Sequence, residues 1–316
     1  MVKRKSNYQS SKPYPYLPKN RVICYTYKTD KFIRRAKEMV QNIKEQYPWA
    51  RYVTASVVVK DGKIIGKAAN RDVHFSFCPR RVFQSPSGED YHLCPRHCHP
   101  NNHSELLSLN DAARKGGKDA SKGASLYMYG HWWCCKPCWD AMAGAGIKDI
   151  YLIEGATELF GSVAFNGVPR SFYYYAASAV TGSKTDTLKS FHQEVANILK
   201  RVNVRAYLPW AHTDPVKHPH FTPSQVYEKN AKKIQESDFV LAHLGEPSLR
   251  VGVEIELARR YRVPVIGFAS KGAKVSRMAL GAPSLKSFFF FNDIKDFIVT
   301  LSEALEDSVS NKALRK

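Results

Sequence analysis

Two short motifs in the first half of the chain combine residue types that bind metals and move protons. His103 and Glu105 stand two positions apart at the start of a predicted helix, and Cys135 and Cys138 form a C-x-x-C at the start of another. One imidazole and two thiolates supply three zinc ligands and leave the fourth tetrahedral position for water, as a catalytic site requires. Glu105 can take a proton from that water and pass it to a substrate. We therefore predict a zinc ion on His103, Cys135 and Cys138, with Glu105 as the general acid and base.

The order H-x-E and then C-x-x-C is typical of zinc deaminases. Residues 22–160 resemble the deoxycytidylate and cytidine deaminase family, through these motifs, through Asn70 at a strand end, and through the stretch from Cys78 to Cys94. The resemblance implies an α/β/α sandwich, hydrolytic deamination, and a contact between Asn70 and the substrate's sugar. The chain departs from the family at Ser104, where Ala is usual, and at Cys134, where Pro is usual.

A second group of potential metal ligands precedes the first motif. It consists of Cys78, Cys94, Cys98 and His99, in a stretch rich in Cys, His, Pro and Arg. These residues could bind a second, structural zinc ion. They could equally be scattered loop residues with buried thiols, and the sequence leaves both interpretations open.

The second half of the chain carries a carboxylate in a position suited to glycosidic chemistry. Glu254 falls in the first turns of a predicted helix that follows a strand and a loop. In a doubly wound sheet, ligands bind beyond the carboxyl ends of the strands, where such helices begin. A carboxylate there can attack, or stabilise, a cation-like sugar carbon. Backbone N–H groups near Ser248 and around Ser178–Ser183 could bind a phosphate.

Residues 171–307 resemble the nucleoside 2-deoxyribosyltransferase superfamily, and in particular its 2′-deoxynucleoside 5′-monophosphate N-hydrolases. The resemblance rests on the loop ASAVTGSK (177–184), the segment PSLRVGVE (247–254) and the segment VSRM (275–278). It implies that Glu254 is the nucleophile and that Ser178, Ser248 and Ser276 hold the 5′-phosphate. Gly182 and Gly252 belong to the same substrate-binding segments. Asn230 stands where the family usually has Asp, and an amide can bond to a base but cannot protonate it.

Periodicity predicts the elements that position these residues. Residues 30–46 show helical spacing, and Asp61-Gly62 between two β-rich runs predicts a hairpin. A strand, a helix and another strand follow up to residue 154, which predicts one sheet with helices on its faces. From residue 171 onward, apolar strands alternate with helices, and VRAYLPW (204–210) and FFFF (288–291) are among the predicted strands. This alternation predicts a doubly wound, Rossmann-like parallel sheet.

Length and charge set the wider limits. The 316 residues favour two domains, and the net charge of +20 favours anionic partners. We predict a disordered basic arm over residues 1–20, a deaminase domain over 21–162 and a deoxyribosyltransferase-like domain over 168–310. The chain shows no secretory signal and no long apolar run, so we expect an intracellular, cytoplasmic protein, with the nucleus open because of the basic arm.

The sequence thus favours a bifunctional nucleotide enzyme and a homo-oligomer. One domain would deaminate a (deoxy)cytidine-type 5′-monophosphate, and the other would cleave the base from a deoxynucleoside 5′-monophosphate. Two alternatives remain. The chain could be a polynucleotide deaminase with a degenerate second domain, which the charge of +20 would suit, although nucleic acid is not the favoured partner. Or the second domain could sense a nucleotide and regulate the deaminase, which Asn230 would suit.

Overall fold

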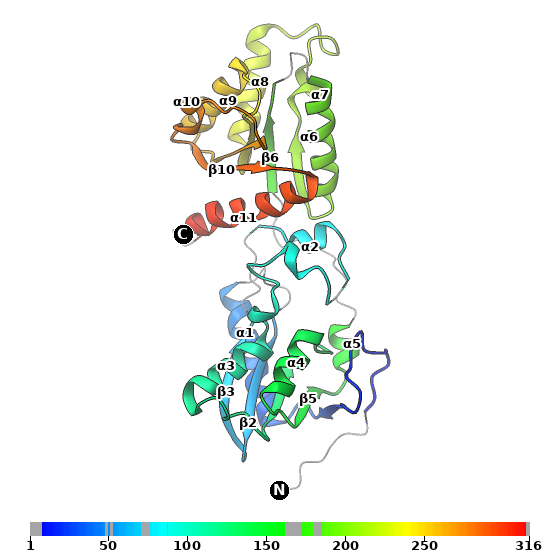
Figure 1. Cartoon of the computed structure of the whole chain (residues 1–316). Helices are drawn as coiled ribbons and strands as arrows, with labels where there is room; N and C mark the ends of the chain where they lie inside the picture. Colours follow the sequence, from blue (N-terminus) through cyan, green and yellow to red (C-terminus); the bar gives the residue numbers. More distant parts are fainter. Residues whose placement is uncertain are drawn as a thin grey trace. The chain divides into compact units, whose positions relative to one another are not determined.

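The computed structural model describes residues 8–47, 50, 53–70, 76–86, 88–161, 172–179 and 185–313. The chain divides into two compact units, which are described separately (Figure 1). The first unit comprises residues 1–74 and 84–166, and the second comprises residues 75–83 and 167–316. Each unit contains a five-stranded sheet.

The sheet of the first unit has the order β1-β5-β4-β2-β3. Its strands are β1 (Ile23–Thr26), β2 (Ala55–Lys60), β3 (Lys63–Ala69), β4 (Ser125–Tyr129) and β5 (Asp149–Ile153). β2 runs antiparallel to β3 and β4, whereas β5 is parallel to β1 and β4. The hairpin predicted at Asp61-Gly62 is confirmed, and both residues have positive φ, at 49° and 75°.

Helices pack on both faces of this sheet. The longer ones are α1 (Lys31–Gln46), α3 (Ser104–Gly116) and α4 (Lys136–Gly144), and the short ones are η1 (Tyr91–Leu93), η2 (Pro100–Asn102) and α5 (Ala156–Phe160). Phe32 of α1 contacts Tyr127. Ser56 pairs in register with Met128, which is the neighbour of Tyr127 on β4. The side chain of Ser56 bonds to Ser104 of α3. Because neighbouring side chains alternate across a strand, α1 and α3 lie on opposite faces.

Gly66 on β3 allows α3 to approach the sheet closely. A Cβ atom at this position would lie 2.3 Å from the carbonyl oxygen of Ser108. No other residue type fits without displacing the helix that carries His103 and Glu105 at its start.

Residues 8–20 differ from the disordered arm that their composition predicted. Tyr8 packs edge-on against the ring of Tyr25, and Tyr14 stacks on Trp132 with ring centroids 6.0 Å apart. Ser10 bonds to Thr157 at 2.8 Å. The side chains of Tyr8, Ser10 and Tyr14 thus attach this segment to the rest of the first unit. Burial of aromatic surface offsets the entropy that is lost when the segment becomes ordered. Residues 1–7 lie outside the described part.

The sheet of the second unit is entirely parallel, as predicted, with the order β10-β9-β8-β6-β7. Its strands are β6 (Phe172–Ala177), β7 (Val204–Tyr207), β8 (Phe239–His243), β9 (Val265–Ser270) and β10 (Leu285–Phe291). β6 lies between β7 and β8, so the chain winds outward from β6 in both directions. Sheets of this kind bind ligands beyond the carboxyl ends of the strands at which the winding direction changes, here β6 and β8.

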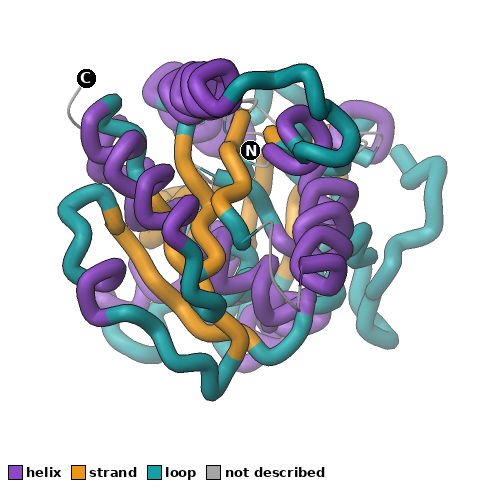
Figure 2. The backbone as a smooth tube through the Cα atoms, turned by 90° about the horizontal axis from the view of Figure 1, so that it is seen from above, coloured by secondary structure: helices purple, strands orange, loops and turns teal. Residues whose placement is uncertain are grey.

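Two layers of helices cover this sheet, as Figure 2 shows. Its helices are α6 (Thr185–Lys200), α7 (Pro209–Thr213), α8 (Pro223–Gln235), α9 (Leu249–Arg260), α10 (Arg277–Leu280) and α11 (Ile294–Ala313). Val195 of α6 and Leu301 of α11 belong to one apolar cluster. Ile234 of α8 and Ile255 of α9 belong to the cluster on the other face. The predicted strand 204–210 ends early because Pro209 begins α7.

The second unit includes nine residues, 75–83, that the sequence analysis assigned to the first domain. They contain the short helix α2 (Pro79–Val82), and Phe77 and Val82 join the apolar cluster of α6 and α11. Ser76 bonds to the buried carboxylate of Glu306 through its N–H at 2.7 Å and its hydroxyl at 2.6 Å. Among the described residues of both units, no helix is long and apolar enough to cross a membrane.

Candidate active sites

The first site lies where α3 and α4 begin. His103 is the N-cap of α3 and Cys135 is the N-cap of α4, with Cys138 in the first turn of that helix. His103 Nδ1 lies 3.3 Å from Cys138 Sγ and 3.6 Å from Cys135 Sγ. These three ligand atoms form a group within 4.8 Å, and Cys134 is not a member of it.

The protonation of these residues suits a cation. The hydrogen bond from Cys138, with a smaller contribution from His103 and against the raising effect of burial, lowers the pKa of the Cys135 thiol to about 4. The same hydrogen bond raises the pKa of the Cys138 thiol, and burial raises it further. His103 Nε2 lies 3.2 Å from the carbonyl oxygen of Cys98, which leaves Nδ1 facing the sulfurs. A backbone carbonyl on the distal nitrogen is the usual partner of a metal-bound imidazole.

Glu105 is buried beside this group, with 5% of its surface exposed. Ser104 donates to its Oε2 at 3.1 Å. Burial lowers the pKa of the His103 imidazole, but the hydrogen bond with Cys135 and the charge of Glu105 outweigh it, so the net shift of this pKa is upward. A buried carboxylate next to a metal-ligand group is placed to exchange protons with whatever the group holds.

Two further residues join this site. Asn70 Oδ1 accepts from the N–H of Thr54 at 3.1 Å, and Thr54 bonds in turn to Ser104 at 3.2 Å, so Asn70 is two hydrogen bonds away from the residue beside Glu105. His131 was not singled out from the sequence. Burial lowers its pKa, and the charges of Glu105, His103 and Cys135 act on it. Its position between β4 and the C-x-x-C was the signal that could have found it.

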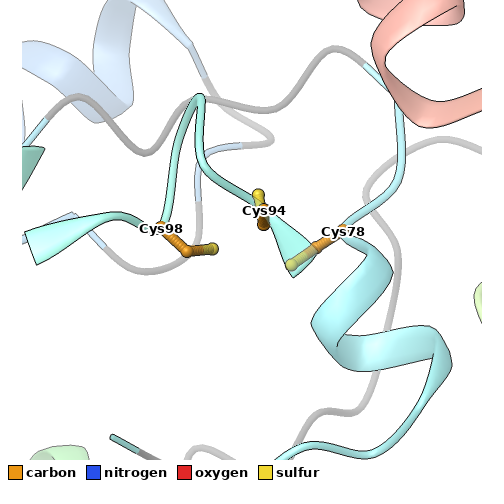
Figure 3. Close-up of side chains that lie close together, drawn as sticks. All are labelled: Cys78, Cys94 and Cys98. Carbon is orange, nitrogen blue, oxygen red and sulfur yellow. The ribbon is translucent and has the colours of Figure 1, made fainter. Parts of the chain in front are cut away.

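The second predicted group of ligands is partly assembled. The sulfur atoms of Cys78, Cys94 and Cys98 lie within 4.8 Å of one another (Figure 3). His99 is not a member of this group, and its Nδ1 accepts from the N–H of Asn101 at 3.2 Å.

The second unit holds Glu254 at the carboxyl end of its sheet. The carboxylate is buried, with 3% of its surface exposed. Tyr175 donates to Oε1 at 2.5 Å and Arg250 Nε donates to the same oxygen at 2.8 Å. Burial raises the pKa of Glu254, against the lowering effects of Arg250 and Tyr175. Among the described residues, no donor reaches Oε2, and the neighbouring Arg250 Nη2 is also buried without an acceptor.

The residues predicted to hold a phosphate surround this end of the sheet. Ser178 follows β6 and is buried, and no described residue bonds to its hydroxyl. Ser248 is the N-cap of α9 and Ser276 is the N-cap of α10. A Cβ atom on Gly252 would meet nothing within 4 Å among the described residues, so the space beside α9 is open there. Gly182 lies outside the described residues.

Asn230 is buried on α8, and no described residue bonds to its Oδ1. It precedes Ala231, which packs in the same apolar cluster as Tyr175 and Val251. An amide that is buried with an unused acceptor carries a desolvation cost, and a bound ligand could offset it.

No curated protein matches the chain. Among solved structures, the cyanophage S-TIM5 dCMP deaminase is 18% identical and covers 57% of this chain and 98% of its own, with a TM-score of 0.24. The CMP N-glycosidase of Clostridium botulinum is 15% identical, covers 42% and 98%, and has a TM-score of 0.33. The 2-deoxyribosyltransferase of Bacillus psychrosaccharolyticus is 16% identical, covers 40% and 89%, and has a TM-score of 0.32.

The remaining comparison concerns protein families. Residues 29–171 match the model of the MafB19-like deaminases. This range contains β2 to β5, helices α3 and α4, and all four residues of the first predicted site. The N-terminal region of the chain is therefore a deaminase domain of the MafB19-like family.

Proposed function

We propose that the first unit is a zinc-dependent deaminase that converts a (deoxy)cytidine-type 5′-monophosphate into its uridine form. One observation carries the proposal: the buried carboxylate of Glu105 adjoins a group made of His103 Nδ1 and the sulfurs of Cys135 and Cys138. One nitrogen and two sulfur donors fit zinc and leave a position for water.

The residues present can carry out the proton transfers of such a reaction. Zinc, when bound, would supply a water molecule with a lowered pKa. Glu105 would move one proton of that water to the pyrimidine ring nitrogen and the second proton to the departing amine. The amine leaves as ammonia, and the oxygen of the water becomes the new carbonyl. Asn70, which is linked through Thr54 to Ser104 beside Glu105, would bind the sugar.

Two measurements on the purified protein test this proposal. Elemental analysis should find at least one zinc per chain, and a second equivalent would point to the three cysteines of Figure 3. Chromatography of a panel of cytosine nucleosides, mono-, di- and triphosphates should show a deaminated product, most rapidly from a monophosphate. Active protein without zinc, or a panel with no deaminated product, would overturn the proposal.

We also propose that the second unit hydrolyses the N-glycosidic bond of a deoxynucleoside 5′-monophosphate. The observation in favour is the state of Glu254: one carboxylate oxygen is held by Tyr175 and Arg250, and the other has no partner among the described residues. A fixed carboxylate with one available oxygen is suited to attack a sugar carbon. Release of free base and deoxyribose 5-phosphate from a deoxynucleotide panel tests it.

The ion pair between Arg250 and Glu254 favours a second candidate, a nucleotide sensor. A guanidinium at 2.8 Å withdraws charge from the carboxylate and would slow its attack on a sugar. A sensor would bind deoxynucleotides and alter the rate of deamination without releasing base.

The polynucleotide alternative has its own test, because binding of single-stranded DNA would fall steeply with salt in a gel shift.

A further inference from the structure

Three buried hydroxyl groups form a connected chain that ends on Glu105. Thr54 Oγ1 donates to Ser104 Oγ at 3.2 Å, and Ser56 Oγ lies 2.8 Å from the same oxygen. Ser104 Oγ in turn donates to Glu105 Oε2 at 3.1 Å. Ser56 and Ser104 are fully buried, so water does not compete for these bonds.

The number of protons on Ser104 fixes the direction of the chain. A hydroxyl has one proton to donate and two lone pairs to accept with. Ser104 uses its proton on Glu105, so both its lone pairs accept, one from Thr54 and one from Ser56. Hydrogen bonds that point the same way polarise one another, and a bond to a carboxylate is stronger than one between neutral groups.

We propose that Ser104 is a positioning residue for deamination: it holds Oε2 of Glu105 so that Oε1 is the oxygen that moves protons. This inference rests on the deaminase function proposed above. It explains a departure from the resembled family, which has Ala at this position. An Ala side chain would leave Oε2 without this donor and would leave the hydroxyls of Thr54 and Ser56 without their acceptor.

The test compares Ser104→Ala with Ser108→Ala in the full chain. Ser108 is a fully buried serine on the same helix, but its hydroxyl donates to the backbone oxygen of Glu105 at 2.9 Å and not to the carboxylate. Ser104→Ala should lower kcat by about tenfold or more, the usual effect of losing a hydrogen bond to a charged group. Its KM should change less than about twofold and its zinc content should stay the same, because the ligands and the substrate contacts remain. Ser108→Ala should leave kcat close to that of the wild type.

A double variant separates positioning from simple packing. Ser56→Ala removes one of the two donors to Ser104 and should lower kcat by a smaller factor. Because Ser56 is inferred to act through Ser104, adding Ser56→Ala to Ser104→Ala should produce no further loss. Equal losses of kcat from Ser108→Ala and Ser104→Ala, or a Ser104→Ala enzyme within about twofold of the wild type, would overturn the inference.

A measurement that needs no turnover keeps this test apart from that of the proposed function. A crystal structure of the wild type should show the Glu105 side chain in one conformer. A crystal structure of Ser104→Ala should show it in several. If the wild type deaminates no nucleotide, the proposed function fails, and these structures still decide the role of Ser104. One unchanged Glu105 conformer in both proteins would refute that role.

Discussion

Tyr175 and Glu254 join the centre of the second sheet to helix α9 through a hydrogen bond of 2.5 Å. The ring of Tyr175 stacks on Tyr207 at 5.5 Å, and Tyr207 stacks on His212 at 4.7 Å. The carboxylate of Glu254 is thus held from the strand side by a rigid aromatic stack and from its own helix by Arg250. This arrangement fixes one oxygen of Glu254.

Replacing Glu254 should separate the two proposed reactions. Glu254→Ala removes the nucleophile but leaves the first unit untouched, so deamination should continue at the wild-type rate. Given a deoxycytidine-type monophosphate, the variant should accumulate the deaminated nucleotide, whereas the wild type should go on to free base and deoxyribose 5-phosphate. Product chromatography over a time course distinguishes the two patterns. Exposed Glu256, which pairs with Arg259, offers the matched control Glu256→Ala. Base release that survives in Glu254→Ala would remove Glu254 from this role.

Asn230 decides between a slow hydrolase and a base reader. If the absence of an acid limits base departure, Asn230→Asp should speed base release, most clearly for poor leaving groups. If the buried amide reads the base, the Asp variant should change the order of preferred substrates or lose activity. Relative rates across a panel of deoxynucleotides measure both effects. Unchanged rates for every substrate would show that Asn230 does not contact the base.

Glu105→Ala should keep the metal and lose the chemistry. The side chain is not one of the three grouped ligands, so zinc content should stay at the wild-type level. Deamination should fall by at least about a hundredfold, since positioned acids and bases contribute that much or more. Elemental analysis together with ammonia release provides the measurement. A variant that deaminates at near the wild-type rate, with zinc bound, would show that another group moves the proton.

Local patterns predicted most of the elements that carry these residues. The hairpin at Asp61-Gly62, helix α1 and the parallel sheet of the second unit all follow from turn chemistry and from the spacing of apolar residues. The strand β1 (Ile23–Thr26) was missed because its four residues are too few to establish a period. Its partner is β5, more than a hundred residues away, and only tertiary pairing reveals it.

The chemistry of the first site was readable because its residue types are rare in combination. His103, Cys135 and Cys138 come together as their spacing indicated. The chain from Thr54 to Ser104 was not predictable, because serine and threonine occur everywhere and only the crossing of β2 beneath α3 aligns them. The contact between Arg250 and Glu254, at 2.8 Å, was not predicted either, because an arginine one helical turn before a glutamate is common on exposed helices.

Ser76→Ala should destabilise the second unit, although Ser76 is separated in sequence from most of that unit. Glu306 is 2% exposed. Its Oε1 accepts two hydrogen bonds from Ser76, one from the N–H and one from the hydroxyl, and the alanine variant loses the second. Loss of a bond to a buried charged group should lower the free energy of unfolding by about 1.5–3 kcal/mol. Urea titration followed by the fluorescence of Trp210, which lies in this unit, measures it. An unchanged midpoint would show that the contact contributes nothing to the stability of the unit.

His192 should make the second unit sensitive to acid. The imidazole is fully buried among Phe191, Trp210 and Phe268, and neither ring nitrogen has a partner among the described residues. Burial, together with a smaller effect of the nearby His243, lowers its pKa to about 3. The unfolded chain, with an ordinary imidazole pKa of about 6.5, therefore binds a proton that the folded chain does not.

The sign of the pH effect follows from this difference. Above about pH 6.5 the imidazole is neutral in both states, and the stability is complete. As the pH falls from there towards about 3, the unfolded state alone takes up the proton, so the free energy of unfolding drops by up to about 1.4 kcal/mol per pH unit. Urea titrations between about pH 8 and about pH 5 should show this loss in the wild type. His192→Phe should flatten the slope, because a phenyl ring occupies the same aromatic site without a proton to bind, whereas His220→Phe, at an exposed position, should not. Equal slopes in the wild type and in His192→Phe would show that the acid sensitivity of this unit arises elsewhere.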